Sequence, residues 1–176
     1  MPGTLTPSSG DPGVNATASV RTVLQLGQEV SAEDCPAESE FHDWVSAAVT
    51  SADYTATLPV TVTIRVVAEA EGMLLNTDFR GKEQPTNVLA FPAEMPPIPA
   101  SALEELELGD LVICLKVAER EAAEQGKAVS QHLAHLTIHG TLHLLGFDHV
   151  EEAAAVAMEA LETRVLQGLG LPDPYA

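Results

Sequence analysis

Positively charged residues are scarce in this chain. Its 176 residues include eight Lys and Arg against 26 Asp and Glu, which gives a net charge of −18. Broad, non-specific binding of nucleic acid depends on many phosphate contacts and is therefore not expected, although a small basic cleft is compatible with the count. We interpret the acidic excess as a solvated surface that favours solubility.

Long apolar runs and cysteines are scarce as well. No run approaches the roughly 20 apolar residues that span a bilayer, and so no membrane contact is expected. No basic region followed by an apolar stretch opens the chain, which predicts that there is no signal peptide and that the protein is cytoplasmic. The two cysteines, Cys35 and Cys114, indicate cytoplasmic usage and no disulfide framework. Cys114, inside "LVICL", is expected to be a buried thiol.

Strand and helix patterns interleave along the chain. Residues 60–67, "VTVTIRVV", alternate as a half-buried strand does. Residues 68–80 predict a helix that ends at Gly81 and turns Met73, Leu74 and Phe79 inward. Further strands are expected at 19–26, 87–92 and 108–115, and further helices at 36–49, 116–125, 130–145 and 151–168.

These patterns predict one α+β domain, with a small mixed β-sheet of about four strands packed with five or six helices. The domain is expected to occupy residues 19–170. A disordered N-terminal tail, rich in Pro, Gly, Ser and Thr, is expected at 1–18, and a C-terminal tail at 171–176.

Histidines are concentrated near the C-terminal end, where five of the six fall between positions 132 and 149. His135, His139 and His143 form a row at spacing four on the predicted helix. The row spans about 12 Å along the helix axis, too far for all three to reach one zinc ion at a Zn–N distance of about 2.0–2.1 Å. A third ligand must therefore come from a chain that turns back. Gly146 permits that turn, and His149 follows it.

The sequence therefore predicts one zinc ion per chain, bound by His139, His143 and His149. His135 is a weaker candidate, for contact with substrate or with a ligand. The spacing resembles the metzincin peptidase signature H-E-x-x-H-x-x-G-x-x-H except that Gly140 stands where that signature has its glutamate base. Peptide hydrolysis needs such a base. Three neutral ligands leave an ion with its full charge, which suits an anionic phosphodiester.

Three stretches of the chain resemble the YbeY family of bacterial rRNA maturation factors. "HGTLHLLGFDH" (139–149) is similar to the family signature, "LNTDFRGKEQPTNVLAFP" (75–92) to its second motif and "LGDLVICL" (108–115) to its third. The resemblance is nearly continuous from about Leu75 to Leu166. It implies a cytoplasmic, zinc-dependent endoribonuclease of YbeY-like fold that cuts single-stranded RNA in 16S rRNA 3′-end maturation and ribosome quality control. Ribosomal proteins or other ribosome-associated factors are the implied partners.

The same resemblance implies that the zinc ligands are His139, His143 and His149 and that Arg80 is the essential arginine. The residues themselves permit this, because a guanidinium can bind phosphate bidentately. Arg80 is equally compatible with a surface arginine at a helix C-terminus, where the helix dipole favours it. Lys82, just beyond Gly81, and Asn76, one turn before Arg80, are further candidates for contact with the substrate or with a metal ligand.

Two alternatives stay open from the sequence. A non-catalytic ribosome-assembly factor would use zinc only to hold its fold, with a fourth protein ligand for which His135 is the nearest candidate. A metzincin-like peptidase would need a carboxylate from elsewhere, such as Asp110 or Asp148. The sequence names no general base, and it leaves water and the 2′-hydroxyl of RNA as alternative nucleophiles.

Overall fold

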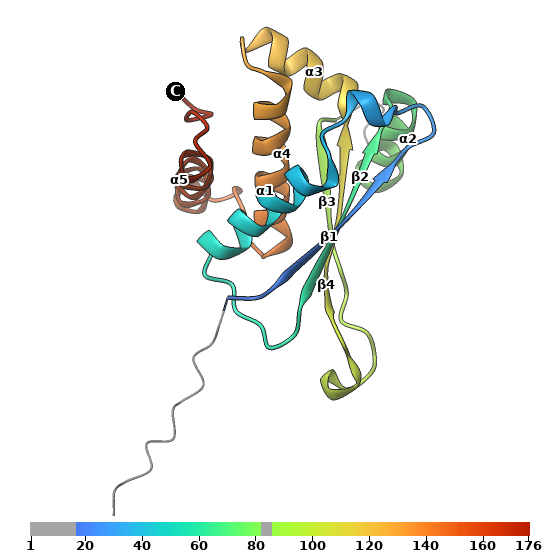
Figure 1. Ribbon diagram of the computed structural model, residues 1–176, viewed down its shortest axis with the longest axis vertical. Coiled ribbons are helices and arrows are strands. Elements are labelled where there is room, and N and C mark those ends of the chain that lie inside the picture. Colours follow the sequence, from blue (N-terminus) through green and yellow to red (C-terminus); the bar gives the residue numbers. More distant parts are fainter. Residues whose placement is uncertain (1–16, 82–85) are drawn as a thin grey trace, which may run out of the picture.

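The structure is a computed structural model, and it describes residues 17–81 and 86–176. These residues form one four-stranded sheet, five α-helices and two 3-10 helices (Figure 1). The strands are β1 (Val20–Leu26), β2 (Val60–Val67), β3 (Val88–Pro92) and β4 (Leu106–Cys114). The α-helices are α1 (Glu38–Ser51), α2 (Glu69–Arg80), α3 (Leu115–Glu124), α4 (Val129–Leu144) and α5 (Glu152–Gly168). The predicted α+β class and mixed sheet are confirmed.

The sheet has the order β1-β2-β4-β3. β2 lies between β1 and β4 and is parallel to both, whereas β3 is antiparallel to β4. Parallel neighbours need a long crossover, which α1 provides between β1 and β2. β3 and β4 are joined by the proline-rich segment 93–105. Of the predicted N-terminal tail, residues 1–16 lie outside the described residues, while Ala18 is buried and donates its N–H to the carbonyl of Tyr54.

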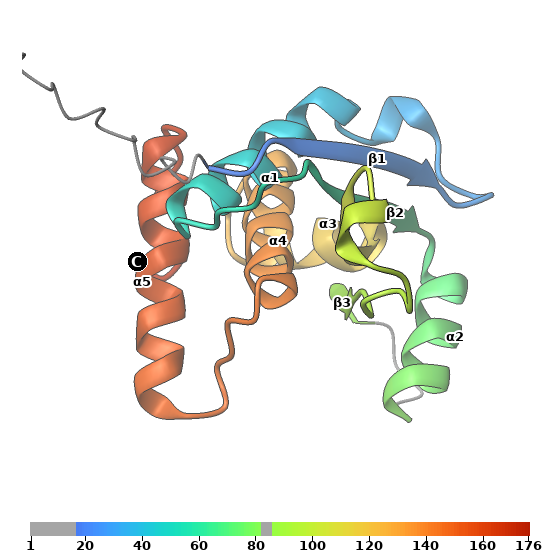
Figure 2. The same cartoon turned by 90° about the horizontal axis from the view of Figure 1, so that it is seen from below.

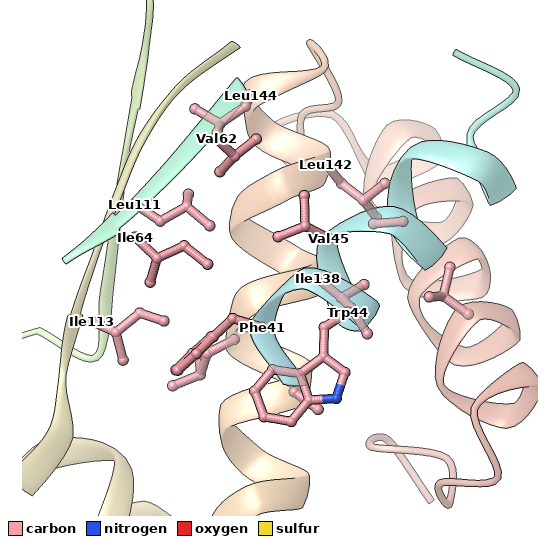
Figure 3. Packing of buried hydrophobic residues seen from close by; sticks show 14 of the residues in the cluster. Phe41, Trp44, Val45, Val62, Ile64, Leu111, Ile113, Ile138, Leu142 and Leu144 are labelled. Carbon is pink, nitrogen blue, oxygen red and sulfur yellow. The ribbon is translucent and has the colours of Figure 1, made fainter. Parts of the chain in front are cut away.

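The main core lies between one face of the sheet and helices α1 and α4. Strand side chains on that face point toward both helices (Figure 3), and the residues that meet there are Phe41, Trp44, Val45, Val62, Ile64, Leu111, Ile113, Ile138 and Leu142. α5 packs against α1 and α4 on the side away from the sheet (Figure 2). α4 is therefore held between the sheet and α5. No helix of the described residues is long and apolar enough to cross a bilayer.

Helix α2 lies on the opposite face of the sheet, and its expected orientation was wrong. Met73, Leu74 and Phe79 are 41%, 62% and 64% exposed. The helix instead approaches the sheet through Gly72 and Asn76, its buried residues. A Cβ at Gly72 would lie 3.4 Å from Cys114 Sγ, so the absence of a side chain allows this close approach. Apolar residues around most of the helix made its buried face ambiguous.

The helix-ending glycines behave as expected. Gly81 follows α2 in the left-handed conformation, with φ 65°, and Gly126 follows α3 with the same φ. Cys114 is buried, 1% exposed, at the end of β4, as expected. These features set the direction in which the chain leaves α2 and enters α4.

Candidate metal centre

Helix α4 presents a row of histidines to an open cleft. The helix contacts β3 and β4 on one side and α1, α3 and α5 on others. The face that remains carries His132, His135, His139 and His143. They border a cleft with a volume of about 830 Å³, whose other polar and charged lining residues include Arg80, Thr86, Asn87, Glu121, Glu124, Gln125, Lys127, His149 and Tyr175.

Three histidines converge at the C-terminal end of α4. Each of the rings of His139, His143 and His149 contributes one nitrogen, and these three nitrogens lie within 4.8 Å of one another. The ring centroids are 4.6 Å apart for His139 and His143, 4.8 Å for His143 and His149, and 5.5 Å for His139 and His149. The structure thus brings together the three residues that spacing and resemblance selected.

The hydrogen bonds of two of these rings fix which nitrogen faces the others. His139 Nδ1 contacts a carboxylate oxygen of Glu162, and His143 Nδ1 lies 3.0 Å from the carbonyl oxygen of Phe147. Both partners only accept hydrogen bonds, so each Nδ1 carries the proton, and in the neutral ring Nε2 is then left with a lone pair.

The two Nε2 atoms, of His139 and His143, lie 3.0 Å apart. Two lone pairs at this distance repel unless a proton or a metal ion lies between them. Ligands at about 2.0–2.1 Å from a tetrahedral zinc are about 3.4 Å apart, close to the separation seen. The donor set of three imidazoles therefore fits a zinc ion. The burial of His143 further supports this fit. Burial, followed by His139 and His149, lowers the pKa of His143, which keeps this ring in the neutral form that a metal needs.

The turn after α4 brings His149 back to the helix end. Gly146 has φ 96°, a conformation that glycine adopts without strain. Asp148 Oδ1 accepts the backbone N–H of His149 at 2.6 Å and that of Val150 at 3.1 Å. Asp148 therefore shapes the turn. Both bonds are made by Oδ1, and they give Asp148 a structural role at the turn.

A buried glutamate on α5 holds the first of the three histidines. Glu162 is 0% exposed. One of its oxygens contacts His139 Nδ1, and the other accepts from the hydroxyl of Tyr175 and lies 3.2 Å from His135 Nε2. Burial raises the pKa of Glu162, but the bonds from His135, His139 and Tyr175 outweigh it and lower the pKa from 4.5 to about 2. The carboxyl group is therefore ionised.

Glu162 and Tyr175 were not among the site residues predicted from the sequence. The available signal was that Glu162 interrupts the apolar face of α5 formed by Met158, Leu161 and Val165, all of them buried. A carboxylate in such a face needs buried partners. Tyr175 lies within residues 171–176, to which only a tail was assigned. Burial, and then Glu162, raise the pKa of its phenol, so that it remains a donor.

His135 lies next to the three histidines but faces away from them. Its Nε2 is 3.2 Å from Glu162 Oε2 and 3.3 Å from the hydroxyl oxygen of Tyr175. His135, His139 and Glu162 also have ligand atoms within 4.8 Å of one another. In that second group, however, Glu162 is already hydrogen-bonded to both His135 Nε2 and His139 Nδ1. His135 is thus a partner of Glu162, and its position does not favour a fourth metal ligand.

Arg80, the last residue of α2, borders the same cleft as the three histidines. Asn76 is 2% exposed and is not among the cleft-lining residues found in the described part of the chain, a position that does not favour contact with a substrate. Lys82 lies outside the described residues. Of the two candidates that the structure describes, Arg80 borders the cleft and Asn76 does not.

Gly140 stands beside the first histidine because the sheet is close. A Cβ at this position would lie 2.7 Å from Leu111 Cδ2 and 3.4 Å from Val88 Cγ2. A glutamate at this position would have to displace these apolar side chains. Asp110, the other carboxylate considered from sequence, is exposed on β4, and the alternation of that strand puts it on the face opposite Leu111 and α4.

Comparison with known proteins identifies relatives over most of the chain. The family described as Endoribonuclease YbeY matches residues 27–170. A protein of Alkalilimnicola ehrlichii named Endoribonuclease YbeY is 54% identical over 142 residues, which are 80% of this chain and 82% of that protein. The solution structure of TM1509 from Thermotoga maritima is similar in fold, with a TM-score of 0.52 and 22% identity over 85% of this chain and 92% of that one. This chain, with its three converging histidines, therefore belongs to the endoribonuclease YbeY family, a family of hydrolases.

Proposed function

We propose that the protein is a zinc-dependent endoribonuclease that cuts single-stranded RNA in the cleft beside α4. Family membership supports the endoribonuclease activity. The observation that carries the zinc assignment is the approach of His139 Nε2 and His143 Nε2 to 3.0 Å, with both Nδ1 atoms engaged elsewhere. His149 adds the third nitrogen. One zinc ion per chain, bound by these residues, fits this donor set.

Each residue of the cleft has a defined task in this proposal. The three histidines bind the ion, and Glu162 holds the ring of His139 by its Nδ1–H. A bound zinc supplies a Lewis acid that can polarise a phosphate oxygen or lower the pKa of a water molecule. Arg80 binds the scissile phosphate and stabilises the charge that develops on it. The location of Arg80 on the same cleft as the histidines supports this role.

The proposed biological role is 16S rRNA 3′-end maturation and ribosome quality control in the cytoplasm, as the family resemblance implies. The charge of the chain supports a partner in this role. With a net charge of −18, the protein repels RNA at long range, and a basic ribosomal protein beside the cleft would offset that repulsion. Ribosomal proteins or other ribosome-associated factors are therefore the partners that we propose.

A panel of substrates tests the proposed activity. The zinc-loaded protein is incubated with an unstructured RNA, the same RNA annealed to its complement, the DNA of the same sequence and casein. We expect cleavage of the unstructured RNA alone, its loss after chelation and its return when zinc is added back. Zinc-dependent cleavage of casein would favour a metzincin-like peptidase instead. Binding of zinc with no cleavage of any substrate would favour the assembly factor with a structural ion.

Within residues 17–81 and 86–176, no observation favours either alternative. A closed structural zinc site needs a fourth protein ligand, and His135, the nearest candidate, faces Glu162 and Tyr175. A peptidase needs a carboxylate base beside the ion. Asp148 accepts bonds from the turn, and Glu162 lies behind His139, on its Nδ1 side.

A further inference from the structure

The C-terminal segment of the chain reaches the metal centre through one buried carboxylate. Glu162 is 0% exposed, and burial of an ionised carboxylate is costly unless its oxygens are hydrogen-bonded. Both oxygens have partners here. Oε1 contacts His139 Nδ1, and Oε2 contacts the hydroxyl of Tyr175 and, at 3.2 Å, Nε2 of His135. The carboxylate is thereby held in one orientation.

We propose that Glu162 is a positioning residue for His139, that Tyr175 and His135 hold Glu162 in place, and that the segment Pro172–Ala176 is therefore part of the metal centre. The proposal rests on the proposed role of His139 as a zinc ligand. A carboxylate that accepts the second N–H of a ligating histidine fixes its tautomer and ring orientation and makes it a stronger ligand. Because Glu162 contacts His139 at Nδ1 while Nε2 faces His143, it acts through that ring.

The segment itself is anchored at two points, which gives Tyr175 a defined position. Asp173 Oδ1 accepts the backbone N–H of Tyr175 at 2.8 Å and the hydroxyl of Thr163, on α5, at 3.3 Å. Lys127, between α3 and α4, donates to the carbonyl of Pro174 at 3.2 Å. The segment thus joins α5 to the start of α4 and borders the cleft with Pro174 and Tyr175.

Contacts of the Tyr175 ring add to this anchoring. The ring meets the imidazole of His135 edge to face, with the centroids 5.4 Å apart and an interplanar angle of 86°. His135 is one helical turn before His139, so the tyrosine, the two histidines and Glu162 pack as one group. A shift of the segment would consequently be transmitted to the ring of His139 through Oε2 and Oε1 of a single carboxylate.

Conservative variants of these residues test the proposal without removing a ligand. Zinc dissociation constants are measured by competition with a chelator for the wild-type protein, Glu162→Gln and Tyr175→Phe. Loss of a partner behind a ligand typically weakens metal binding by about 10- to 100-fold, which we expect for Glu162→Gln. Tyr175→Phe removes one hydrogen bond and should weaken binding by about two- to ten-fold. Should Glu162→Gln fail to fold, Tyr175→Phe decides the question.

Two control variants separate positioning from general stability. Tyr54→Phe alters the other of the chain's two tyrosines. Glu121→Gln alters a glutamate of α3 that pairs with His132, which lies on α4 as His139 does. We expect both controls to bind zinc as tightly as the wild type. The melting temperature of each zinc-free protein is measured beside its affinity.

The outcomes distinguish this inference from the proposed metal site. Zinc affinities of Glu162→Gln and Tyr175→Phe within the error of the wild-type value, or changes equal to those of the controls, would overturn the positioning role. A change in zinc-free melting temperature with no change in affinity would also overturn it, because it would show that the group is only structural. If His143→Ala keeps its zinc as well, the assignment of the metal centre itself fails.

Discussion

The two ends of helix α4 each pair a histidine with a glutamate from a neighbouring helix, yet the pairs differ in their surroundings. Near the C-terminal end, His139 contacts Glu162 of α5, which is fully buried. Near the N-terminal end, His132 Nε2 lies 2.6 Å from Oε2 of Glu121 of α3, whose side chain is 30% exposed. Asn87 also donates to Glu121, at 3.3 and 3.1 Å from its two oxygens.

The second nitrogen of each histidine separates a candidate metal site from a structural contact. Nε2 of His139 faces another imidazole at 3.0 Å, in a cleft that is open to solvent. Nδ1 of His132 is buried and has no hydrogen-bond partner among the described residues. Glu121 and Asn87 link the start of β3 to α3 and α4, a structural task. A histidine–glutamate pair therefore indicates a metal centre only when the free nitrogen meets further ligands.

The largest expected effect comes from removing one histidine at each end. His143→Ala should reduce the zinc content from about one ion per chain to near zero and abolish RNA cleavage, since two imidazoles do not complete the site. His132→Ala should keep its zinc but lose about 1–3 kcal/mol of unfolding free energy, because a buried hydrogen-bonding partner is removed. Elemental analysis and urea denaturation measure the two effects. Equal zinc loss in both variants would remove the contrast between the ends.

Arg80 should affect the reaction without affecting the metal. Arg80→Ala is expected to lower the cleavage rate by about a hundred- to a thousand-fold, or on the order of 3–4 kcal/mol, since a phosphate contact in the transition state is lost. Zinc content should stay unchanged, and stability should change by no more than about 0.5 kcal/mol. Arg80→Lys should restore part of the rate, because an ammonium group cannot bind phosphate bidentately.

A matched control for this variant is Arg120→Ala. Arg120, on α3, has a 57% exposed side chain and pairs with Glu69 at 2.5 Å. Surface pairs of this kind contribute little, so its removal should leave cleavage close to the wild-type rate. The role assigned to Arg80 is wrong if both arginine variants cleave single-stranded RNA at the same rate as the wild-type protein.

Zinc affinity should decline in acid with a moderate slope. Histidines bind metal in the neutral form, and their ordinary pKa is about 6.5, so affinity should fall as the pH drops below about 6.5. The pKa of His143 is lowered, first by burial, which means that this ring is still neutral where an ordinary histidine takes up a proton. At about pH 5.5, where three ordinary histidines would be almost fully protonated and would give a slope near three, the logarithm of the affinity should therefore change by fewer units per pH unit. Competition titrations across this range measure the slope, and a full three-proton slope would contradict the state inferred for His143.

The smallest effect distinguishes Gly140, which packs against the sheet beside the candidate metal centre, from Gly168, which has no such neighbours. Gly140→Ala gains helix propensity, about 1 kcal/mol, but its Cβ would lie 2.7 Å from Leu111 Cδ2, and overpacking typically costs about 1–3 kcal/mol. The net change should be a destabilisation of up to about 2 kcal/mol with zinc binding retained. Gly168→Ala, whose Cβ would meet no atom within 4 Å, should stabilise slightly. Thermal unfolding of both variants provides the comparison, and stabilisation by Gly140→Ala would contradict the proposed reason for this glycine.

The convergence of the three candidate ligands could be predicted from the sequence because it depends on local geometry. His139 and His143 are one helical turn apart, and the return of His149 needs only a glycine in a particular backbone conformation, which Gly146 has. The helix α2 was predicted at the right place but with the wrong face inward. Its buried stripe contains Gly72 and Asn76, residues that a search for apolar periodicity passes over.

Glu162, His135 and Tyr175 show what the sequence left undetermined. Their contacts join residues separated by 13 to 40 positions, and no spacing rule connects a tail residue with a helix two elements away. The interruption of an apolar face by one glutamate is visible in the sequence, but the partner that satisfies it is not.

The sequence by itself determined the fold class and the three converging histidines, since hydrophobic periodicity and helical spacing act over a few residues at a time. The family followed from the resemblance of three stretches of the chain to family motifs. Tertiary structure decided which nitrogen of His139 and of His143 is free, because this depends on the acceptors that pack behind each ring: Glu162 for His139 and the carbonyl of Phe147 for His143. It also decided that Arg80 borders the cleft while Asn76 is buried. The reason is physical: direction, burial and hydrogen-bond satisfaction are properties of packed surfaces, and these form only when distant parts of the chain meet.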